Sequence, residues 1–334
     1  MPRTLTLLAC AGALSAQAQL TITDSLTVGS ISTLLEGIGV VVSNVTVNCP
    51  EAAMGHFIGT SELAITEGLV LTTGMADLVA GPVGNWATLG WGSPGDPDLD
   101  LDAGTGIPTN DACVLEFDCV PQGDTLLFNF SFGSEEYQEF VGSSFNDAFA
   151  IYLSGPGFMP RVNVAAIPGG TIVAINNVND LLNTGYYHNN ETPVAGQYVS
   201  YDGFTTNLTA FAVVQPGLTY HFKVAIADMA DAAFDSGVFL EAFSFRSPMI
   251  TTGLDEESLP MMQLLRRGDA LFMLVPPDQA HGQEVFVFDP AGHLVQRARV
   301  QDHAVTIDIA DLKPGLYVVR VDDDSIPPLR FVKE

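Results

Sequence analysis

Two groups of residues with side-chain oxygens, nearly all of them acidic, stand where we expect β-strands to end, and their spacing could hold a cation. The first group is Asp228, Asp231 and Asp235, and the second is Glu135, Glu136, Asn146 and Asp147. Calcium takes about six to eight oxygen ligands, often from Asp side chains and loop carbonyls. We therefore expect a structural calcium site built from Asp228, Asp231, Asp235, Glu136 and Asp147, provided that the two junctions meet in space. The alternative is that these side chains cap turns by accepting hydrogen bonds from backbone N–H groups.

A second candidate calcium site lies in a loop rich in Gly, Pro and Asp at residues 81–106. Its carboxylates alternate along the chain at Asp96, Asp98, Asp100 and Asp102. In an extended chain, residues two apart point the same way, so these four would spread along about 20 Å. They can reach one ion only if the loop curls, and the alternative is a solvated acidic loop.

Aromatic residues concentrate in two long loops that we expect at residues 81–106 and 176–203. The candidate ligand-binding residues are Trp86, Trp91, Tyr186 and Tyr187. Aromatic rings beside Asn and Asp are typical of a sugar-binding surface, because rings stack on apolar sugar faces while amides and carboxylates bond hydroxyls. The alternative is that these rings cover the end of the hydrophobic core.

Paired carboxylates also raise the alternative of a carbohydrate-active hydrolase. Such enzymes use two carboxyl groups about 5–10 Å apart across a cleft, and Glu136 with Asp147 or Asp228 would be the pair. The sequence contains no His-Glu-x-x-His, Gly-x-Ser-x-Gly or P-loop motif. We therefore expect a protein that is not an enzyme.

The acidic composition narrows the range of partners. The chain has 334 residues, 47% of them hydrophobic, and a formal charge of −27. Residues 20–250 contain 25 acidic residues but only three Lys or Arg residues, Arg161, Lys223 and Arg246. Most carboxylates must therefore be solvated or neutralised by bound cations. Binding to nucleic acid depends on Lys and Arg, so we expect no nucleic-acid partner. No apolar run reaches about 18 residues, which argues against a transmembrane span.

The first 18 residues have the pattern of a Sec signal peptide. Arg3 precedes a short apolar run over residues 5–15, and Ala16-Gln17-Ala18 is a small-x-small cleavage site. We predict cleavage at Ala18 and export of the chain.

Export permits disulfide bonds among the three remaining cysteines, Cys49, Cys113 and Cys119. Cys113 and Cys119 lie in one segment that reads as extended and would span about 20 Å. A disulfide requires Cα atoms within about 7 Å, so these two can pair only if the segment turns back. A bridge from Cys49 to one of them and three buried free thiols are both open alternatives.

Short alternating segments bounded by Gly and Pro predict an all-β protein. Apolar and polar residues alternate over 126–132 and again over 218–226, a period that marks half-buried strands. We expect a large antiparallel, jelly-roll-like β-sandwich over residues 19–250. A linker at 251–262 and a small immunoglobulin-like β-sandwich over 263–334 would follow.

The C-terminal unit resembles the type A sorting domain of the type IX secretion system. The likeness runs in order through residues 287–295, 307–321 and 330–333. Its motif residues are Asp289, Gly292, Pro314, Gly315 and Tyr317. The resemblance implies export by the type IX machinery to the outer-membrane surface or the extracellular space. It also implies removal of the domain, with attachment to surface lipopolysaccharide or release.

Residues 20–250 resemble the choice-of-anchor L family, whose members share this module but end in different surface anchors. The matching stretches are 39–46, 68–74, 115–118, 132–137, 145–147, 153–157, 201–206 and 226–240. The resemblance implies a cell-surface role and supplies no activity. We therefore expect a secreted bacterial protein that is displayed or released as a non-catalytic adhesion or ligand-binding module for a glycan, host or matrix ligand. The alternatives are the hydrolase and a structural component of a surface coat.

Overall fold

The computed structural model describes residues 20–84, 86–143, 146–229, 233–248, 263–267, 270–274, 284–289, 292–300, 304–321 and 329–333. The predicted signal peptide with its cleavage site at Ala18, the predicted linker 251–262 and Asp231 lie outside these residues.

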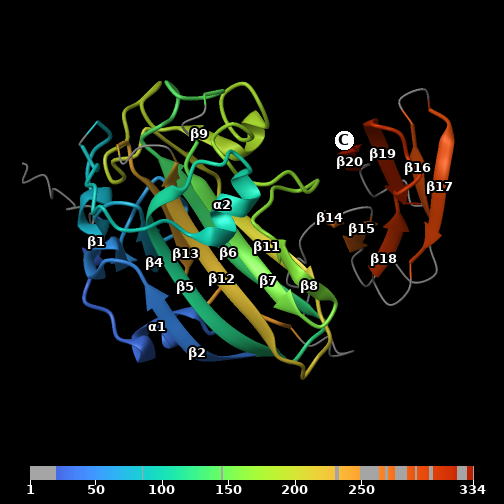
Figure 1. Ribbon diagram of the computed structural model, residues 1–334, viewed down its shortest axis with the longest axis horizontal. Coiled ribbons are helices and arrows are strands. Elements are labelled where there is room, and N and C mark those ends of the chain that lie inside the picture. Colours follow the sequence, from blue (N-terminus) through green and yellow to red (C-terminus); the bar gives the residue numbers. More distant parts are fainter. Residues whose placement is uncertain are drawn as a thin grey trace, which may run out of the picture.

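Residues 20–248 form two antiparallel sheets that pack face to face, which confirms the predicted sandwich (Figure 1). The larger sheet runs in the order β1 (Thr21–Thr23), β3 (Met54–Ile58), β4 (Glu67–Thr72), β13 (Ser236–Glu241), β6 (Thr125–Ser134), β10 (Gly203–Thr205) and β9 (Tyr187–Asn189), and β11 (Leu208–Val213) also pairs with β6. The smaller sheet runs in the order β2 (Val40–Asn48), β5 (Thr109–Pro121), β12 (Tyr220–Met229), β7 (Ala148–Gly155) and β8 (Phe158–Asn163).

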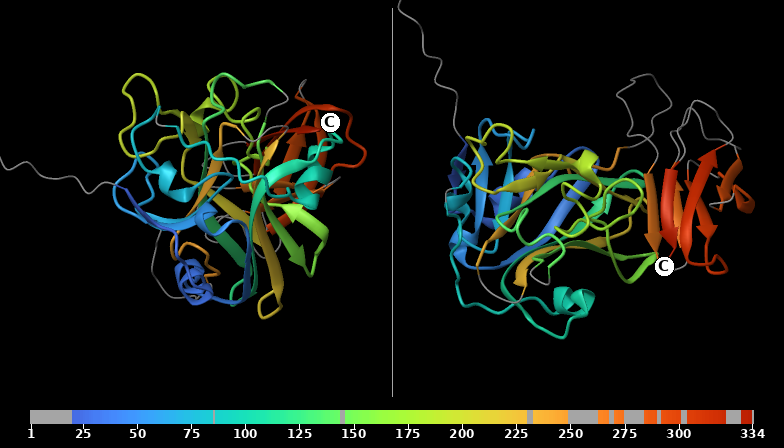
Figure 2. Two further views of the ribbon diagram at one scale, coloured as in Figure 1. Left: turned by 60° about the vertical axis from the view of Figure 1, so that its left-hand side comes forward. Right: turned by 90° about the horizontal axis from the view of Figure 1, so that it is seen from above.

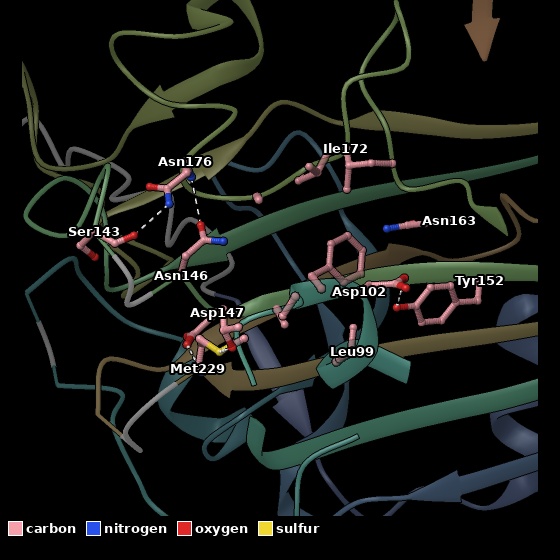
Figure 3. Close-up of a pocket in the computed structure, with 16 residues that line it drawn as sticks. Leu99, Asp102, Ser143, Asn146, Asp147, Tyr152, Asn163, Ile172, Asn176 and Met229 are labelled. Atoms are coloured by element: carbon pink, nitrogen blue, oxygen red, sulfur yellow. Dashed lines mark hydrogen bonds between the residues drawn. The ribbon is translucent and has the colours of Figure 1, made fainter. Parts of the chain in front are cut away.

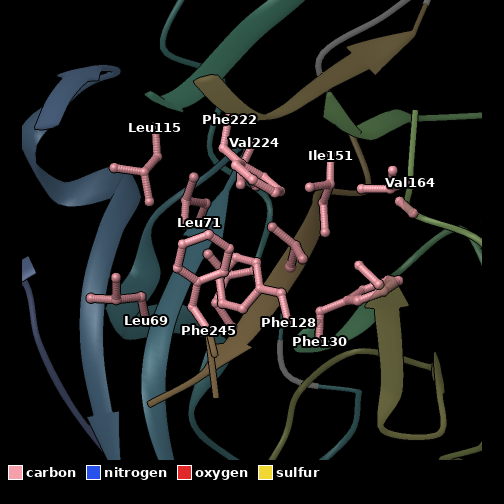
Figure 4. Close-up of a cluster of buried hydrophobic side chains, with 14 of the residues drawn as sticks. Leu69, Leu71, Leu115, Phe128, Phe130, Ile151, Val164, Phe222, Val224 and Phe245 are labelled. Carbon is pink, nitrogen blue, oxygen red and sulfur yellow. The ribbon is translucent and has the colours of Figure 1, made fainter. Parts of the chain in front are cut away.

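The hydrophobic core lies between the two sheets, where inward residues alternate along each strand. β6 contributes Phe128 and Phe130, and β12 contributes Phe222 and Val224 (Figure 4). The ring of Phe222 stacks on Phe117 of β5 with 5.4 Å between centroids. Burial of one such side chain contributes about 1.5–3 kcal/mol. This core fixes the strand ends, and with them the polar residues that come directly before or after the strands.

The described residues contain two α-helices, α1 (Val28–Leu35) and α2 (Pro97–Ala103). They also contain the 3-10 turns η1 (Glu51–Ala53), η2 (Ala76–Val79) and η3 (Thr184–Tyr186). Thr27 caps the start of α1, because its hydroxyl accepts a hydrogen bond from the Ser30 N–H at 3.1 Å. Its buried face, with Ile31 and Leu35, joins the core.

A disulfide joins Cys49, just after β2, to Cys113 on the neighbouring strand β5, with 4.3 Å between Cα atoms. Cys119 is a buried free thiol. Because Cys113 and Cys119 both lie on β5, they cannot pair with each other. The structure thus selects the bridge from Cys49 among the two alternatives that the sequence leaves open.

The C-terminal unit consists of two smaller antiparallel sheets around a core of its own (Figure 2). One sheet runs β14 (Gln263–Arg267), β15 (Ala270–Leu274) and β18 (Ala304–Asp308). The other runs β17 (Leu294–Arg299), β16 (Glu284–Phe288), β19 (Gly315–Val321) and β20 (Leu329–Lys333). This arrangement agrees with the small β-sandwich that the sequence predicts.

The predicted sorting-motif residues occupy turns and the core of this unit. Asp289 follows β16 and closes a turn in which its carbonyl accepts a hydrogen bond from the N–H of Gly292, at 2.9 Å. Pro314 is exposed and precedes Gly315, the first residue of β19. Tyr317 is buried and stacks on Phe331 at 5.3 Å between centroids.

Candidate functional site

Six buried acidic side chains gather at one end of the first sandwich. They are Asp111, Glu135, Glu136, Asp147, Asp228 and Asp235, each no more than 6% exposed. Charge repulsion links Asp228 to Asp111, Glu136 and Asp235, and links Asp147 to Asp228. The structure therefore brings the two predicted acidic junctions together. We call these six side chains the carboxylate cluster.

The alternation of the strands places the cluster between the sheets. On β12, Phe222, Val224 and Ile226 point into the core, and Asp228 continues this inward series at the strand end. Asp147 stands two residues before the inward Phe149 of β7. The polar residues thus take over the inner faces of the strands where the apolar core ends.

Asp147 connects elements of both sheets. Its Oδ1 accepts a hydrogen bond from the Met229 N–H at 3.0 Å, and its Oδ2 accepts one from the Ser236 hydroxyl at 2.7 Å. Its own N–H donates to Oε2 of Glu136 at 3.2 Å. Both carboxylate oxygens and the backbone N–H of Asp147 therefore have hydrogen-bond partners within the protein.

Three other members of the cluster accept hydrogen bonds from the loop that follows residue 85. Glu135 accepts hydrogen bonds from the Ala87 N–H at 2.8 Å and from the Thr88 hydroxyl at 2.9 Å. Asp235 accepts one from the Leu89 N–H at 2.8 Å. Asp111 accepts hydrogen bonds from the backbone N–H groups of Trp91 and Ser93. Glu135 and Asp235 thus accept hydrogen bonds from backbone N–H groups, as in the turn-capping alternative that the sequence offered, and Asp111 does the same.

Asp228 differs from the others because neither of its carboxylate oxygens has a hydrogen-bond partner. The side chain is 1% exposed, and Oδ1 of the neighbouring Asp235, which is 0% exposed, also lacks a partner. The hydroxyl of Thr73 lies close enough to favour the charged form of both groups but does not reach hydrogen-bond geometry with these oxygens. Buried polar atoms normally have partners, so three unpaired carboxylate oxygens mark an unusual place in the protein.

Burial raises the pKa of Asp147, Asp228 and Asp235 because it penalises their charged forms. Desolvation is the largest cause at each group, and neighbouring carboxylates add to it. The pKa of Asp228 rises to about 8, and that of Asp235 rises to about 7. The pKa of Asp147 lies well above its usual range, with repulsion from Asp228 and Glu136 following desolvation. The cluster therefore favours bound protons or a bound cation over bare carboxylates.

Within the described residues, no three His, Cys, Asp or Glu side chains are already arranged to hold a metal ion. The cluster thus offers two neighbouring carboxylates with unpaired oxygens, Asp228 and Asp235, rather than a complete set of acidic ligands. Any further ligands would have to be neutral oxygens or water.

The second candidate calcium site is part of helix α2. Asp96 caps the helix by accepting hydrogen bonds from the N–H groups of Asp98 and Leu99, and the helix ends at Gly104 in a left-handed conformation. Proline at the first helical position and glycine after the last are favourable in this arrangement. The expectation of a loop is therefore wrong here, because local capping produces a helix.

The four carboxylates around α2 have partners other than a metal. Lys223 lies 2.7 Å from Asp96 and 2.6 Å from Asp98. Arg161 lies 3.0 Å from Asp102. Oδ1 of Asp100 accepts hydrogen bonds from the N–H and hydroxyl of Thr109. Two of the three Lys and Arg residues between 20 and 250 thus form ion pairs with acidic residues of α2 and its N-cap.

A cavity of about 280 Å³ lies next to the carboxylate cluster (Figure 3). Its apolar walls include Leu99, Phe149, Ile172 and Met229, and its polar walls include Asp102, Asn146, Asp147, Tyr152, Asn163 and Asn176. Asp147 belongs to both the cavity and the cluster. The cavity combines apolar surface with amide groups, which is the usual character of a small-ligand site.

Hydrogen bonds fix the orientation of two amides in the cavity wall. Oδ1 of Asn163 accepts the N–H groups of Ile151 at 3.2 Å and Ala165 at 2.9 Å. Oδ1 of Asn146 accepts the Asn176 N–H at 3.0 Å. The NH₂ groups of Asn163 and Asn146 therefore point the other way, toward the space between the labelled side chains (Figure 3). The cavity presents two hydrogen-bond donors in fixed positions.

The four predicted aromatic ligand-binding residues do not line this cavity. Trp86 is 66% exposed, and its ring lies 5.6 Å from that of Phe234. The indole N–H of Trp91 donates to the carbonyl of Gly74 at 2.7 Å. Tyr186 and Tyr187 are partly buried against the core. Of these four rings, Trp86 alone is largely exposed.

Two features of the site escaped the sequence analysis. Asp111 takes a left-handed conformation at the point where the pairing of β5 with β12 is irregular. The signal that could have found it is an acidic residue directly before the apolar run 112–115. The amide of Asn163 carries no such signal, because Asn is common in loops and at strand ends. The sequence points to Asn146 beside the acidic residues as a possible part of a calcium site, not as a hydrogen-bond donor to a ligand.

These two β-sandwiches, one large and one small, define a modular all-β protein. The chain belongs to the choice-of-anchor L domain family, whose sequence profile matches residues 22–246. A secretion system C-terminal sorting domain matches residues 273–328. Both predicted resemblances are confirmed, and the sorting domain indicates type IX secretion to the cell surface or the extracellular space. Among the described residues, the search for a helix long and apolar enough to cross a membrane found none.

No curated protein matches the chain. Among solved structures, a β-glucuronidase of Faecalibacterium prausnitzii is 12% identical with a TM-score of 0.20, and the match covers 66% of this chain and 37% of that one. A β-1,2-glucanase from Parabacteroides distasonis is 9% identical with a TM-score of 0.22, covering 90% and 38%. The BSP domain of a biofilm associated protein is 8% identical with a TM-score of 0.19, covering 66% and 48%. The chain spans less than half of each of these structures, and likeness at this level carries no argument about function.

Proposed function

We propose that this exported protein is a non-catalytic ligand-binding module that attaches to neutral, polyhydroxylated ligands such as glycans. The observation that carries the proposal is the cavity of about 280 Å³ with the NH₂ groups of Asn163 and Asn146 directed into it. Oxygen-rich ligands can accept hydrogen bonds from these donors, and Leu99, Phe149 and Ile172 can contact their apolar faces.

The charge of the protein favours a neutral ligand over an anion. The chain carries a formal charge of −27, and the acidic Asp102 and Asp147 both line the cavity. An anion would have to approach these groups without a free cation, because Arg161 is already held by Asp102. A sugar hydroxyl meets no such repulsion and finds two amide donors.

The acidic side chains that line the cavity already accept hydrogen bonds from other protein groups, which supports a binding role over hydrolysis. Oδ1 of Asp102 accepts a hydrogen bond from Arg161 and Oδ2 accepts one from Tyr152, while both oxygens of Asp147 hold protein groups. Glu136 and Asp228, the other members of the predicted catalytic pairs, do not line the cavity. A carbohydrate-active hydrolase and a structural component of a surface coat stay alternatives, and the following test distinguishes them from a ligand-binding module.

The test is binding of the purified full chain to an array of neutral and acidic glycans, compared with Asn163→Asp. This change keeps the oxygen that accepts two backbone N–H groups and replaces the donor NH₂ with an acceptor. Asn189→Asp is a matched control, because Oδ1 of Asn189 also accepts two backbone N–H groups, at 2.9 and 3.0 Å, and Asn189 does not line the cavity.

We expect binding to neutral glycans that Asn163→Asp weakens by about tenfold or more, the equivalent of one hydrogen bond, and that Asn189→Asp leaves unchanged. Equal binding by both variants would contradict the assignment to this cavity. Cleavage of a bound glycan would favour the hydrolase instead, and self-assembly at rising concentration without glycan binding would favour the coat.

A further inference from the structure

We propose that the carboxylate cluster binds one divalent cation, Ca²⁺ by the chemistry of its donors, at the unpaired oxygens of Asp228 and Asp235. The inference goes beyond the proposed ligand-binding role. Asp228 and Asp235 do not line the cavity, so cation binding and glycan binding can fail independently.

The unpaired oxygens are the first support. Asp228 is 1% exposed with both oxygens lacking a partner, and Asp235 is 0% exposed with Oδ1 lacking one. An isolated buried carboxylate is strongly unfavourable unless it is neutralised. The Thr73 hydroxyl is near Asp228 but does not reach hydrogen-bond geometry with either oxygen, so both oxygens are left to a proton or a cation.

None of the Lys and Arg side chains described between residues 20 and 248 can supply this neutralisation. Lys223 and Arg161 are committed to the acidic residues of α2. Arg246 is exposed, and its backbone pairs with Leu127 near the start of β6, whereas the cluster lies beyond the other end of that strand. The remaining candidates are a metal cation and protons.

The donor chemistry selects calcium among common cations. Every side-chain donor in the cluster is oxygen, which suits hard cations rather than zinc or copper. Two carboxylates supply only part of a coordination shell, and among the described residues no group of three His, Cys, Asp or Glu side chains is in place to hold an ion, so carbonyl oxygens or water would have to supply the rest. Calcium accepts carbonyl oxygens and water in irregular geometry, whereas magnesium requires a nearly ideal octahedron.

The backbone around Asp235 is shaped for a close approach. A Cβ at Gly74 would overlap the carboxylate of Asp235, so only glycine allows Asp235 its position. The carbonyl of the same Gly74 accepts the indole N–H of Trp91 at 2.7 Å. An ion at Asp235 would therefore lie near an indole, which makes Tb³⁺, a luminescent substitute for Ca²⁺, a suitable probe.

The experiment uses the full chain after dialysis against EDTA. Thermal unfolding is recorded without metal, with Ca²⁺ and with Mg²⁺, and Tb³⁺ luminescence excited through tryptophan reports binding directly. The variants are Asp228→Asn and Asp235→Asn, with Asp77→Asn as a control because Asp77 is exposed. Circular dichroism checks that each variant folds.

We expect Ca²⁺ to raise Tm by several degrees with a much smaller effect of Mg²⁺. Even ligands outside the first coordination shell change metal affinity by about 10–100-fold, so Asp228→Asn and Asp235→Asn should each weaken Tb³⁺ binding at least tenfold. Asp77→Asn should bind like the natural chain. The proposal is overturned if the natural chain shows no response to Ca²⁺ or Tb³⁺, since protons would then satisfy the cluster. It is also overturned if Asp228→Asn responds as the natural chain does.

Discussion

The hydroxyl of Ser236 donates a hydrogen bond of 2.7 Å to Oδ2 of Asp147, and this bond joins the two sheets of the sandwich. Ser236 begins β13 in the larger sheet, and Asp147 directly precedes β7 in the smaller one. Asp147 also lines the cavity. One buried contact therefore ties the packing of the sheets to the wall of the proposed ligand site.

We expect Ser236→Ala to destabilise the protein by about 1–3 kcal/mol, because the buried Asp147 loses its side-chain donor. Urea unfolding of the full chain measures the difference. Ser25→Ala is the control, since Ser25 is exposed. A change of less than about 0.5 kcal/mol, the usual range for surface substitutions, would mean that this bond contributes little.

The disulfide between Cys49 and Cys113 closes a loop with a sequence separation of 64 residues. The chain-entropy estimate for such a loop is about 4 kcal/mol, and measured values usually lie near 2–4 kcal/mol. The double variant Cys49→Ala with Cys113→Ala should therefore lose stability in this range in guanidinium unfolding.

Cys119→Ala is the control for this prediction, because Cys119 is a free thiol and its removal breaks no bridge. Burial raises the pKa of the Cys119 thiol to about 12, so it should react with thiol reagents only after unfolding. The appearance of two further reactive thiols in the unfolded, unreduced chain would contradict the bridge.

Lys223 neutralises Asp96, which is 6% exposed, and also contacts Asp98. Lys223→Met would leave the carboxylate of Asp96 buried without its cation, which costs about 3 kcal/mol. Since Leu99 and Asp102 of α2 form part of the cavity wall, glycan binding should weaken as well.

Hydrogen exchange of the amides in α2 provides the measurement for Lys223→Met, with Arg246→Met as the control because Arg246 is exposed. Faster exchange in α2 with unchanged exchange in β12 is the expected result. Unchanged protection of α2 would show that the helix does not depend on Lys223.

Asp202 supplies a prediction about pH. Desolvation raises its pKa to about 7, with repulsion from Glu191 and Glu135 next in size. The folded state therefore prefers protonated Asp202, and the stability that this proton provides is full below the unfolded pKa near 4 and is lost as pH rises through about 7.

Asp202→Asn should accordingly stabilise the protein at pH 8 and have little effect at pH 4. Because Asp202 is partly exposed, we expect a gain on the order of 1 kcal/mol rather than the full value of the shift. Thermal unfolding in EDTA at the two pH values is the measurement, with the exposed Asp180→Asn as the control. Equal effects at both pH values would contradict the raised pKa.

The strand pattern could be predicted because it is local. Alternation along 218–226 indicates a half-buried strand, and the structure contains it as β12. The same alternation carries Asp228 to the inner face at the strand end. Whether Asp147 meets Asp228 depends on the pairing of β7 with β12, which brings together residues 67 to 79 positions apart and cannot be read from either segment.

Helix α2 has a local signal in its sequence that competes with the alternation of its acidic residues. The period of two from Asp96 to Asp102 suggests extended chain, but Asp96, Pro97 and Gly104 are a helix cap, a first helical residue and a helix end. The cavity had no such signal. Its amides come from Asn146 and Asn163, before and after β7 in the chain, and other lining residues come from α2 and from Ile172, so only the assembled fold shows it.

The most direct test of the proposed glycan site follows the side-chain NH₂ signals of Asn163 and Asn146 by NMR while a neutral glycan is added. We predict that these two signals shift in proportion to binding, while the NH₂ signal of Asn189 stays in place. Binding that leaves both cavity signals unchanged and perturbs the indole N–H of Trp86 instead would contradict the account and move the ligand site to the exposed aromatic loop.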